Sequence, residues 1–419
     1  MTASAGALES ERSLAAGRFD RAFWIGIGLT AIAALVYWLS NRFFDARHAD
    51  FFYLADAFLQ GRTWYDPTTA PPGAIGPADV IPIGGRYYVP FAPFPAIAFM
   101  PLVAIIGPVA ADEWETGINA VLAAASVGLG WWLLHRFDVR SLANRFWLVL
   151  LLGFSTQIWW VTTRGGVWHT GHLIATILTL GCLIELAGRR RPIVIGLLAG
   201  AAFLSRAPLA MAVPFYALLY AGDAVWEPRR WPWREWAGLA AGILPSVVFF
   251  FWYNDARFGS PFESGYGLAT LPDWLAARRD LGLFALAHVP MNLELLFVHL
   301  PAPIPDPPFF RPDGLGLSIF ITSPGLLYAI RGPWRESRTW WLAGAALLVL
   351  VPTLLYYGGG WLQYGYRYAL DSIPFIWAIC GLAAARQERA GETIGWLWRG
   401  LILFGVLVGT AGVYWAYHI

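Results

Sequence analysis

The chain has 419 residues, of which 58% are hydrophobic and 13% are charged, whereas an average soluble domain has about 25% charged residues. Its formal net charge of +2 identifies no partner, but apolar runs long enough to cross about 30 Å of hydrocarbon recur along the chain and exclude a soluble globular protein. Cys182 and Cys380 both lie inside such runs, which argues against a disulfide framework or a cysteine metal site. Without a nucleic-acid motif, residues 1–419 are predicted to form one transmembrane domain with no nucleic-acid partner.

Eleven apolar segments follow one another along the chain, and each is predicted to span the membrane as a helix. The first is expected to be an uncleaved helix rather than a signal peptide, because no small-residue cleavage site follows it. The predicted spans are 22–40, 117–135, 146–163, 169–187, 192–205, 208–222, 236–253, 314–330, 339–357, 370–385 and 396–417. The predicted fold is therefore an all-α polytopic bundle of about eleven transmembrane helices.

Arginine clusters give these segments an orientation. All 29 basic residues are arginine, and short cytoplasmic loops carry an excess of basic residues. Six groups of three arginines separate pairs of predicted spans: Arg12, Arg18 and Arg21; Arg136, Arg140 and Arg145; Arg189, Arg190 and Arg191; Arg229, Arg230 and Arg234; Arg331, Arg335 and Arg338; and Arg386, Arg389 and Arg399. Placing all six groups inside predicts a multi-pass plasma-membrane protein with a cytoplasmic N-terminus and an extracytoplasmic C-terminus.

Two long segments are left outside by this topology, a first outer loop at 41–116 and a second at 254–313. In the first, the segment 49–61 predicts an amphipathic juxtamembrane helix that ends at Gly61. The apolar stripe of this helix is formed by Phe51, Leu54, Ala55, Phe58 and Leu59. The two loops are expected to form a small cap of short helices and turns over the outer membrane surface.

The remainder of the first outer loop contains a predicted hairpin and an apolar run that is difficult to place. Residues 80–91 predict a β-hairpin with Gly84-Gly85 as its turn. The run at 91–109 is apolar but interrupted by several prolines, which remove backbone donors and break helices. A span here would also move every later arginine cluster outside. It is therefore predicted to be a re-entrant or interfacial helix on the outer face.

Charged groups at the outer ends of spans cost free energy unless they are paired or wet, so they are candidates for function. The first group is Asp45, His48, Asp50 and Asp56, directly after the first span. Asp50 and Tyr53 share a helix face away from the apolar stripe, where a carboxylate can act as general base toward an acceptor hydroxyl. The alternative is a solvated interfacial helix with an aspartate as its N-cap.

A second and a third group lie between later spans. Arg164, His169 and His172 occupy one outer turn, where two histidines three positions apart can bind a metal or form a hydrogen-bonding pair. The pair is the preferred interpretation, and no metal site is assigned. Arg206 interrupts a long apolar run, so it is held by a carboxylate or a phosphate, or it faces water. Arginine binds phosphate in a bidentate manner, which favours a phosphate-binding role.

The fourth group combines Arg257 with Gln363, Tyr366, Arg367 and Asp371 from a later outer loop. The density of polar and aromatic residues in both loops favours a binding site. Arg257 and Arg367 are predicted to bind phosphate. The alternative for Arg367 is a structural pair with Asp371, four residues further on.

Together these features resemble the GT-C superfamily of polyprenyl-phosphate-sugar-dependent glycosyltransferases, which includes protein O-mannosyltransferases and lipid A aminoarabinose transferases. The stretch DFFYLADAFLQG, with Asp50, Tyr53, Ala55 and Gly61, resembles the juxtamembrane helix that carries a catalytic aspartate in that family. The stretch VPFAPFPAIAFMPLVAIIG resembles its second, proline-rich juxtamembrane helix, and GLLAGAAFLSRAP its helix–turn–helix element with a basic residue. RYALDSIPF resembles the pattern R-Y-x-x-P-x-x-P-F, with Asp371 where proline is common.

The resemblance implies that a sugar moves from a polyprenyl-phosphate carrier to a lipid or glycan acceptor on the outer face by direct displacement. Asp50, or otherwise Asp45, would take the proton of the acceptor hydroxyl. Arg206, Arg257 and Arg367 would neutralise the lipid phosphate as it leaves. The remaining substrate contacts are assigned to His48, Tyr53, Arg164, His169, His172, Gln363 and Tyr366.

The prenyl chain would lie in an apolar groove between helices, in contact with membrane lipids. No nucleotide or other cofactor is implied, because the sequence has no Gly-rich phosphate loop. Two other classes remain open: a transporter or flippase of a lipid-linked substrate, for which inverted repeats are expected but not found, and a non-catalytic membrane scaffold. A transporter needs polar groups through the midplane, whereas this sequence concentrates them near one face.

Overall fold

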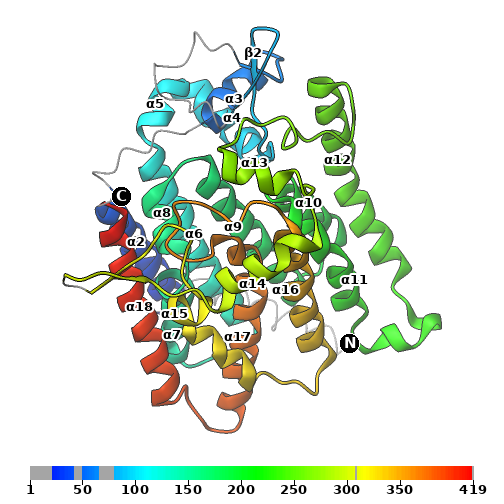
Figure 1. The fold of residues 1–419 in the computed structure, drawn as a ribbon. Coiled ribbons are helices and arrows are strands. Elements are labelled where there is room, and N and C mark those ends of the chain that lie inside the picture. The colour runs from blue at the N-terminus through cyan, green and yellow to red at the C-terminus, as the bar shows by residue number, and fades with distance from the viewer. Residues whose placement is uncertain (1–20, 42–49, 66–79, 307–308, 418–419) are drawn as a thin grey trace.

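The computed structural model describes residues 21–41, 50–65, 80–306 and 309–417. Within them the chain forms a bundle of helices with two small two-stranded antiparallel sheets (Figure 1). Seven stretches are long and apolar enough to cross a membrane: α2 (Arg21–Asn41), α6 (Glu115–Arg136), α9 (Val167–Ala187), Ala207–Trp226, α12 (Trp233–Phe258), α16 (Ser337–Leu355) and α18 (Trp396–Ala416). An eighth is formed if α7 (Leu142–Phe154) and α8 (Ile158–Arg164), bent by 40°, are one span.

The prediction of an all-α polytopic membrane protein is confirmed, whereas the count of about eleven spans is not. Three predicted spans correspond to elements that are short for crossing 30 Å of hydrocarbon. These are α10 (Pro192–Phe203), the pair α15 (Ile319–Thr322) and η6 (Pro324–Arg331), and α17 (Ile373–Arg389). Within Ala207–Trp226, the helix is divided into η2 (Ala207–Ala212), α11 (Val213–Ala221) and η3 (Gly222–Trp226), and η4 (Pro228–Arg230) follows.

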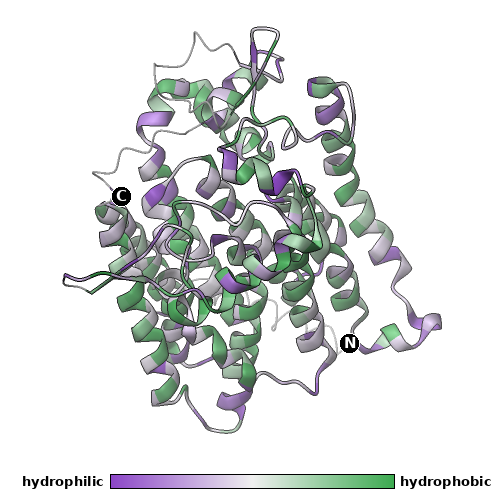
Figure 2. Ribbon diagram, viewed as in Figure 1, coloured by the Kyte–Doolittle hydropathy of each residue, from purple (hydrophilic) through white to green (hydrophobic). Residues whose placement is uncertain are grey.

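Helices at the periphery of the bundle expose apolar side chains, as expected where lipid is the solvent. Leu35 of α2, Val248 of α12 and Leu407 of α18 are each more than half exposed. The ribbons of these helices are coloured mainly as hydrophobic in Figure 2, and polar residues gather toward the two ends of the bundle. By contrast α17 is central, with Phe375 and Trp377 fully buried.

Small residues allow α10 and α12 to cross in backbone contact. A Cβ atom added to Gly196 would clash with the backbone oxygen of Leu239, and one added to Gly242 would clash with that of Ile193. Without a hydrophobic driving force between helices in lipid, such close packing is a main source of helix association. The crossing positions the ends of both helices, next to which Arg206 and Arg257 lie.

One end of the bundle carries the cap, defined here as α3 (Asp50–Leu59), β1 (Ile81–Ile83), β2 (Arg86–Tyr88), α4 (Phe94–Ile106) and α5 (Pro108–Glu113), and lies at the top of Figure 1. The predicted hairpin is present, since β1 and β2 pair antiparallel and Gly84 and Gly85 have φ values of 57° and 76°. Both central residues of a type I′ turn need positive φ, which glycine adopts without strain. The run at 91–109 forms α4, whose 13 residues and internal Pro101 do not make a straight span.

The amphipathic interpretation of the first cap helix needs correction. In α3 the residues Asp50 to Ala55 and Ala57 are all buried, because α4, α5 and the start of α9 pack around it. Leu59, predicted to belong to the apolar stripe, is instead 43% exposed. The helix therefore has no solvated face that holds Asp50 and Tyr53, and the alternative of a solvated interfacial helix is wrong.

The second predicted outer loop follows α12, which continues to Phe258. It contains α13 (Asp273–Arg279), η5 (Leu286–His288), α14 (Val289–Phe297), β3 (Ala302–Pro303) and β4 (Phe310–Arg311). The side-chain amide of Asn292 donates to the carbonyl oxygens of Leu354 and Tyr356 at 2.9 Å each, and these hydrogen bonds anchor the segment to the end of α16.

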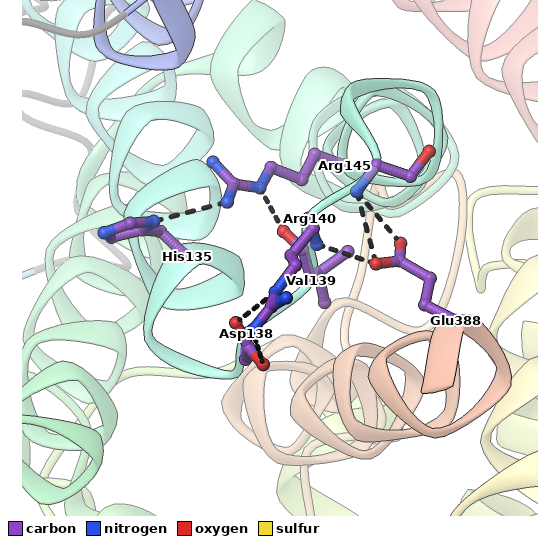
Figure 3. A network of polar contacts seen from close by, with 7 residues as sticks. His135, Asp138, Val139, Arg140, Arg145 and Glu388 are labelled. Atoms are coloured by element: carbon purple, nitrogen blue, oxygen red, sulfur yellow. Dashed lines mark hydrogen bonds and ion pairs between the residues drawn. The ribbon is translucent and has the colours of Figure 1, made fainter. Parts of the chain in front are cut away.

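At the opposite end, called the base here, the half-buried carboxylate of Glu388 in α17 joins this helix to the turn between α6 and α7. It accepts a hydrogen bond from the backbone N–H of Arg140 (2.7 Å), in the turn between α6 and α7 (Figure 3). It also accepts one from the side-chain amide of Asn144 in α7 (2.7 Å). In the same view, Arg145 donates to the carbonyl oxygen of Val139. Arg140 and Arg145, two members of the second arginine cluster, thus make hydrogen bonds that stabilise the turn between α6 and α7.

Candidate active site

A buried ionic cluster lies where α9, the turn after α10 and η7 (Arg367–Asp371) meet. Asp371 is 3% exposed, and its Oδ1 accepts a hydrogen bond from Nδ1 of His172 at 2.9 Å. Its Oδ2 lies 3.1 Å from both Nε and Nη2 of Arg206. Of the options that the sequence left open for Arg206, the carboxylate is its partner. Nη1 of Arg206 has no acceptor among the described residues, and 20% of its side chain is exposed.

The alternative pairing of Arg367 with Asp371 is not formed, because this segment is a 3₁₀-helix. With three residues per turn, positions i and i+4 lie about a third of a turn apart, so the two side chains point in different directions. Asp371 turns toward Arg206, while Nη1 of Arg367 donates to the carbonyl oxygen of Trp361 at 3.1 Å. Tyr368 lies between the two arginines, and its ring centroid is 5.3 Å from each guanidinium carbon.

Several buried polar atoms in this region lack a partner within the described chain. Nε2 of His169, Nε2 of His172 and Nε of Arg367 are all inaccessible and make no hydrogen bond there. Nδ1 of His169 contacts the carbonyl oxygen of Gly165, so Nε2 is the ring nitrogen of His169 that has no hydrogen-bond partner there. Buried polar groups are normally satisfied, so such a group indicates bound water or ligand atoms. Among the described residues, no cluster of three or more His, Cys, Asp or Glu side chains could hold a metal ion.

Arg257 is placed differently from the other two predicted phosphate ligands. Its guanidinium donates to the carbonyl oxygen of Val89 (2.6 Å) and to the side-chain oxygen of Asn254 (2.8 Å), and thus joins the end of α12 to the hairpin. Tyr266 lies between this arginine and Arg206. Burial raises the pKa of Tyr266 to about 12, and the charges of Arg206 and Arg257 both oppose that rise.

Asp50 lies at the start of α3 and is completely buried. Its helix neighbour Tyr53 donates a hydrogen bond to Asp112 of α5 at 3.0 Å. Burial, followed by the charge of Asp112, raises the pKa of Tyr53, so its hydroxyl stays protonated and donates. The aromatic rings of Phe51, Phe91 and Tyr266 form successive edge contacts at 6.5 Å, which connect the start of α3 to the Arg206 region. The predicted residues Asp45 and His48 lie outside the described residues.

Glu115 was not predicted as a site residue, yet it organises this end of α9. Its Oε1 accepts from the backbone N–H of Gly166 at 3.0 Å and lies 3.1 Å from the hydroxyl of Thr170. A carboxylate at a helix N-terminus is favoured by the helix dipole. Arg164 ends α8 on the other side of the Gly165-Gly166 turn and is half-buried, and its charge reaches His169. A signal was available, because Glu115 is an acidic residue at the edge of a predicted span.

Gln363 and Tyr366, predicted to bind substrate, are buried inside the loop that precedes η7. The amide of Gln363 donates to the carbonyl oxygens of Leu315 (2.7 Å) and Gly359 (2.9 Å), and its oxygen accepts from the backbone N–H of Arg367. Tyr366 is 1% exposed and packs in the main core. Both residues therefore shape the loop that presents Arg367, and direct substrate contact by either remains a prediction.

Comparisons with known proteins place this geometry in a fold class. No family model matches the chain, and no curated protein matches it in sequence. Among solved structures, the chain resembles the apo crystal structure of the Archaeoglobus fulgidus oligosaccharyltransferase, with a TM-score of 0.53 and 14% sequence identity. The likeness covers 96% of this chain and 56% of that one, so the chain spans little more than half the length of that protein.

The fold is therefore that of a multi-pass membrane protein, and it resembles the fold of this oligosaccharyltransferase. At this level of identity the likeness defines the fold alone. The chemistry has to be argued from the residues of this chain.

Proposed function

We propose that this chain is a GT-C-type membrane glycosyltransferase that moves a sugar from a polyprenyl-phosphate-linked donor to a lipid or glycan acceptor at its cap end. The observation that carries the proposal is the group of basic side chains beside η7. In a bundle with this fold, Arg206 and Arg367 flank Tyr368 and retain donors that no described residue accepts. A phosphate or phosphodiester oxygen is the acceptor that such donors bind best.

In the proposed reaction, the bond between the anomeric carbon and the lipid phosphate oxygen breaks while the acceptor oxygen forms a new bond to that carbon. Arg206 and Arg367 stabilise the negative charge that develops on the departing phosphate. His172 is fixed by Asp371 through Nδ1, so its Nε2 is directed as a further contact for the donor. Arg257 is retained as a third phosphate ligand, although its present partners already account for its burial.

Asp50 is the proposed general base, with Asp45 as the second candidate. A sugar hydroxyl has a pKa far above 7, so a carboxylate accepts its proton only while the new bond forms. The prenyl chain is proposed to lie in an apolar groove between helices, and no cofactor beyond the lipid-linked donor is proposed. Arg164, His169 and Tyr53 are proposed to contact the sugar or acceptor near these groups.

The cap end is proposed to be extracytoplasmic in a plasma membrane, with the N-terminus inside, the C-terminus outside and eleven spans. The measurement is labelling of single cysteines by a membrane-impermeant reagent. Cys182 and Cys380 are fully buried, so the background of this assay is low. Positions in 64–80 are expected to react from outside, and positions in 138–144 only after permeabilisation. Labelling of both from the same side would contradict this topology.

A transporter or flippase of a lipid-linked substrate is the second candidate. It requires polar groups along a path through the bundle, whereas the buried acidic, basic and histidine side chains of the described residues lie near helix ends or in connecting segments. Those at or near the cap are Asp50, Glu115, His169, His172, Arg257, His288, Arg367 and Asp371, while Arg145 is at the base. This distribution favours transfer at one membrane surface.

The test is transfer of labelled sugar from a panel of polyprenyl-phosphate donors in proteoliposomes. Asp50→Asn keeps size and hydrogen bonding but removes basicity, and it is expected to slow transfer by about 10² to 10⁴. Asp56→Asn is the matched control on the same helix, because its carboxylate is already engaged by Gln60 at 2.7 Å. Asp45→Asn tests the second candidate. If neither Asp50→Asn nor Asp45→Asn slows transfer, the proposed mechanism is wrong.

A further inference from the structure

A second anion-binding feature lies at the base, far from the cap. It is a pocket of about 330 Å³ among the ends of α6, α9, α11, α16 and α17. Its walls are formed by Arg136, Phe137, Leu183, Leu186, Ala187, Arg190, Leu219, Arg338, Leu342 and Leu382. Three of these residues are arginines, and no carboxylate lines the pocket. The glycosyl transfer proposed above makes no use of this pocket.

The three arginines differ in how far the chain already satisfies them. Arg136 makes no hydrogen bond or ion pair with any described residue, and its guanidinium carbon lies 5.4 Å from the centre of the Trp132 ring. It lies against Gly188, where an added Cβ would come within 3.3 Å of that carbon. This contrasts with Arg140 and Arg145 of the same cluster, which are held by neighbouring residues (Figure 3). Arg136 therefore keeps its full capacity to bind an anion.

Arg190 and Arg338 contribute positive charge with donors to spare. Nη2 of Arg190 donates to the carbonyl oxygens of Leu219 (3.1 Å) and Tyr220 (2.9 Å), which fixes its direction without neutralising it. Nε of Arg338 pairs with Glu336 at 2.6 Å, outside the pocket wall. Counting that one carboxylate, the three guanidinium groups retain an excess of two positive charges around the opening.

The rim of the pocket is charged, and its floor is apolar. The three arginines are exposed, whereas Leu183, Leu342 and Leu382 are at most 3% exposed. The rim lies where α6 ends at Arg136 and just after α9 ends, the level at which a membrane-spanning helix meets the headgroups. A free phosphate would use only the rim, and an apolar ligand only the floor. A phospholipid with an anionic headgroup matches both.

We infer that this pocket binds one anionic phospholipid at the base of the bundle. Its phosphate is bound by Arg136, Arg190 and Arg338, because guanidinium groups form short, charge-assisted hydrogen bonds to phosphate oxygens. One acyl chain lies against the half-buried Leu186 and Leu219, above that leucine floor. Basic pockets between transmembrane helices are a recurring form of lipid recognition. The site is independent of the proposed transfer reaction and of its donor.

The experiment measures the thermal unfolding of the purified full-length chain in zwitterionic detergent. Phosphatidylglycerol, phosphatidylcholine and soluble glycerol phosphate are added separately. A ligand that binds only the folded state raises the midpoint, and a shift of about 3 °C beyond phosphatidylcholine is expected for phosphatidylglycerol. The variant R136Q/R338Q is expected to lose this shift. The control R229Q/R335Q removes two exposed arginines from the same end that do not line the pocket, and it is expected to keep it.

A second measurement counts bound lipid directly and does not depend on unfolding. Native mass spectrometry counts retained phosphatidylglycerol molecules, and R136Q/R338Q is expected to bind the first one at least 10-fold more weakly than the parent chain. Equal shifts in both double variants would overturn the inference, because the effect would then follow general surface charge. A shift of the same size with glycerol phosphate would also overturn it, since the site would then bind a free anion and not a lipid.

Discussion

Two carboxylates, one at each end of the bundle, illustrate different uses of a negative charge. At the base, Glu388 accepts hydrogen bonds chiefly from backbone N–H groups, including those of Arg140 and Ser141. Near the cap, the hydrogen bonds that Asp371 accepts from described residues come from the side chains of Arg206 and His172. A carboxylate bound to backbone fixes the path of a loop. One bound to side chains fixes the direction of ionisable groups and leaves their outer edges available.

The largest difference between the two ends is expected in catalysis. Arg367→Gln removes a donor that no carboxylate holds, and loss of one such donor is expected to lower kcat by about 10² to 10³. Arg140→Gln, at the base, is the matched control and is expected to stay within about two-fold of the parent rate, since its guanidinium is exposed and pairs with Asp138. The measurement is sugar transfer in proteoliposomes. Equal losses in the two variants would remove the functional distinction between the ends.

Stability is expected to separate the two carboxylates by a smaller amount. Asp371→Asn leaves the largely buried Arg206, whose side chain is 20% exposed, without its charge partner. Breaking a buried pair costs about 3–5 kcal/mol, and the partial exposure of Arg206 places the expected cost near the lower figure. Glu388→Gln retains an oxygen that accepts from the loop, so the expected cost is about 1–2 kcal/mol. Cys182 and Cys380 are fully buried, so a thiol-reactive dye reports the unfolding of each variant.

A double variant shows whether the pair itself causes that loss. R206Q/D371N removes both charges, and it is expected to be more stable than Asp371→Asn alone because no unpaired charge stays buried. If the double variant is less stable by the sum of both single costs, Arg206 and Asp371 act independently.

The smallest expected effect concerns a third arrangement, in which one imidazole bridges two carboxylates in the second loop. His299 contacts Glu294 at 2.8 Å and Asp313 at 2.9 Å. Burial lowers the pKa of His299, but its hydrogen bonds to Glu294 and Asp313 outweigh burial, so the net pKa is raised. A raised pKa gives a stabilisation that is complete below about pH 6.5, the unfolded value, and is lost as pH rises through the folded value.

The loop around His299 is therefore expected to be held more firmly in mildly acidic solution than at pH 8. Hydrogen exchange of residues 294–318, corrected for intrinsic rates, should be slower at pH 5.5. His299→Gln is the control and should abolish the difference. A parent protein with pH-independent protection would show that the bridge does not stabilise this segment.

Features set by local sequence could be predicted well. The hairpin at 80–91 depends on Gly84-Gly85, whose positive φ angles follow from the turn itself. Long apolar runs are equally local, so the polytopic class followed from them. The number of spans did not, because buried elements such as α17 are shielded by other helices and need not be as long as the membrane is thick.

The candidate site was predictable as a set of residues but not as a set of contacts. Arg206, His172 and Asp371 were each identified as polar residues near span ends, yet Asp371 meets partners 165 and 199 positions away. No periodicity within one segment encodes such pairs, and the local alternative of Arg367 with Asp371 failed because η7 is a 3₁₀-helix. Tyr368 was missed, since an aromatic residue in a membrane protein is usually an interfacial one.

The bonds accepted by Glu388 also set an order of events during synthesis. They reach back 248 positions to Arg140 and 244 to Asn144. Because the ribosome delivers the N-terminal helices first, the turn between α6 and α7 is made long before its acceptor exists. Its amide groups must stay hydrated until α17 is made. A nascent chain released before that point would carry inserted helices with an open turn at the base, a natural target for membrane proteases that remove incomplete chains.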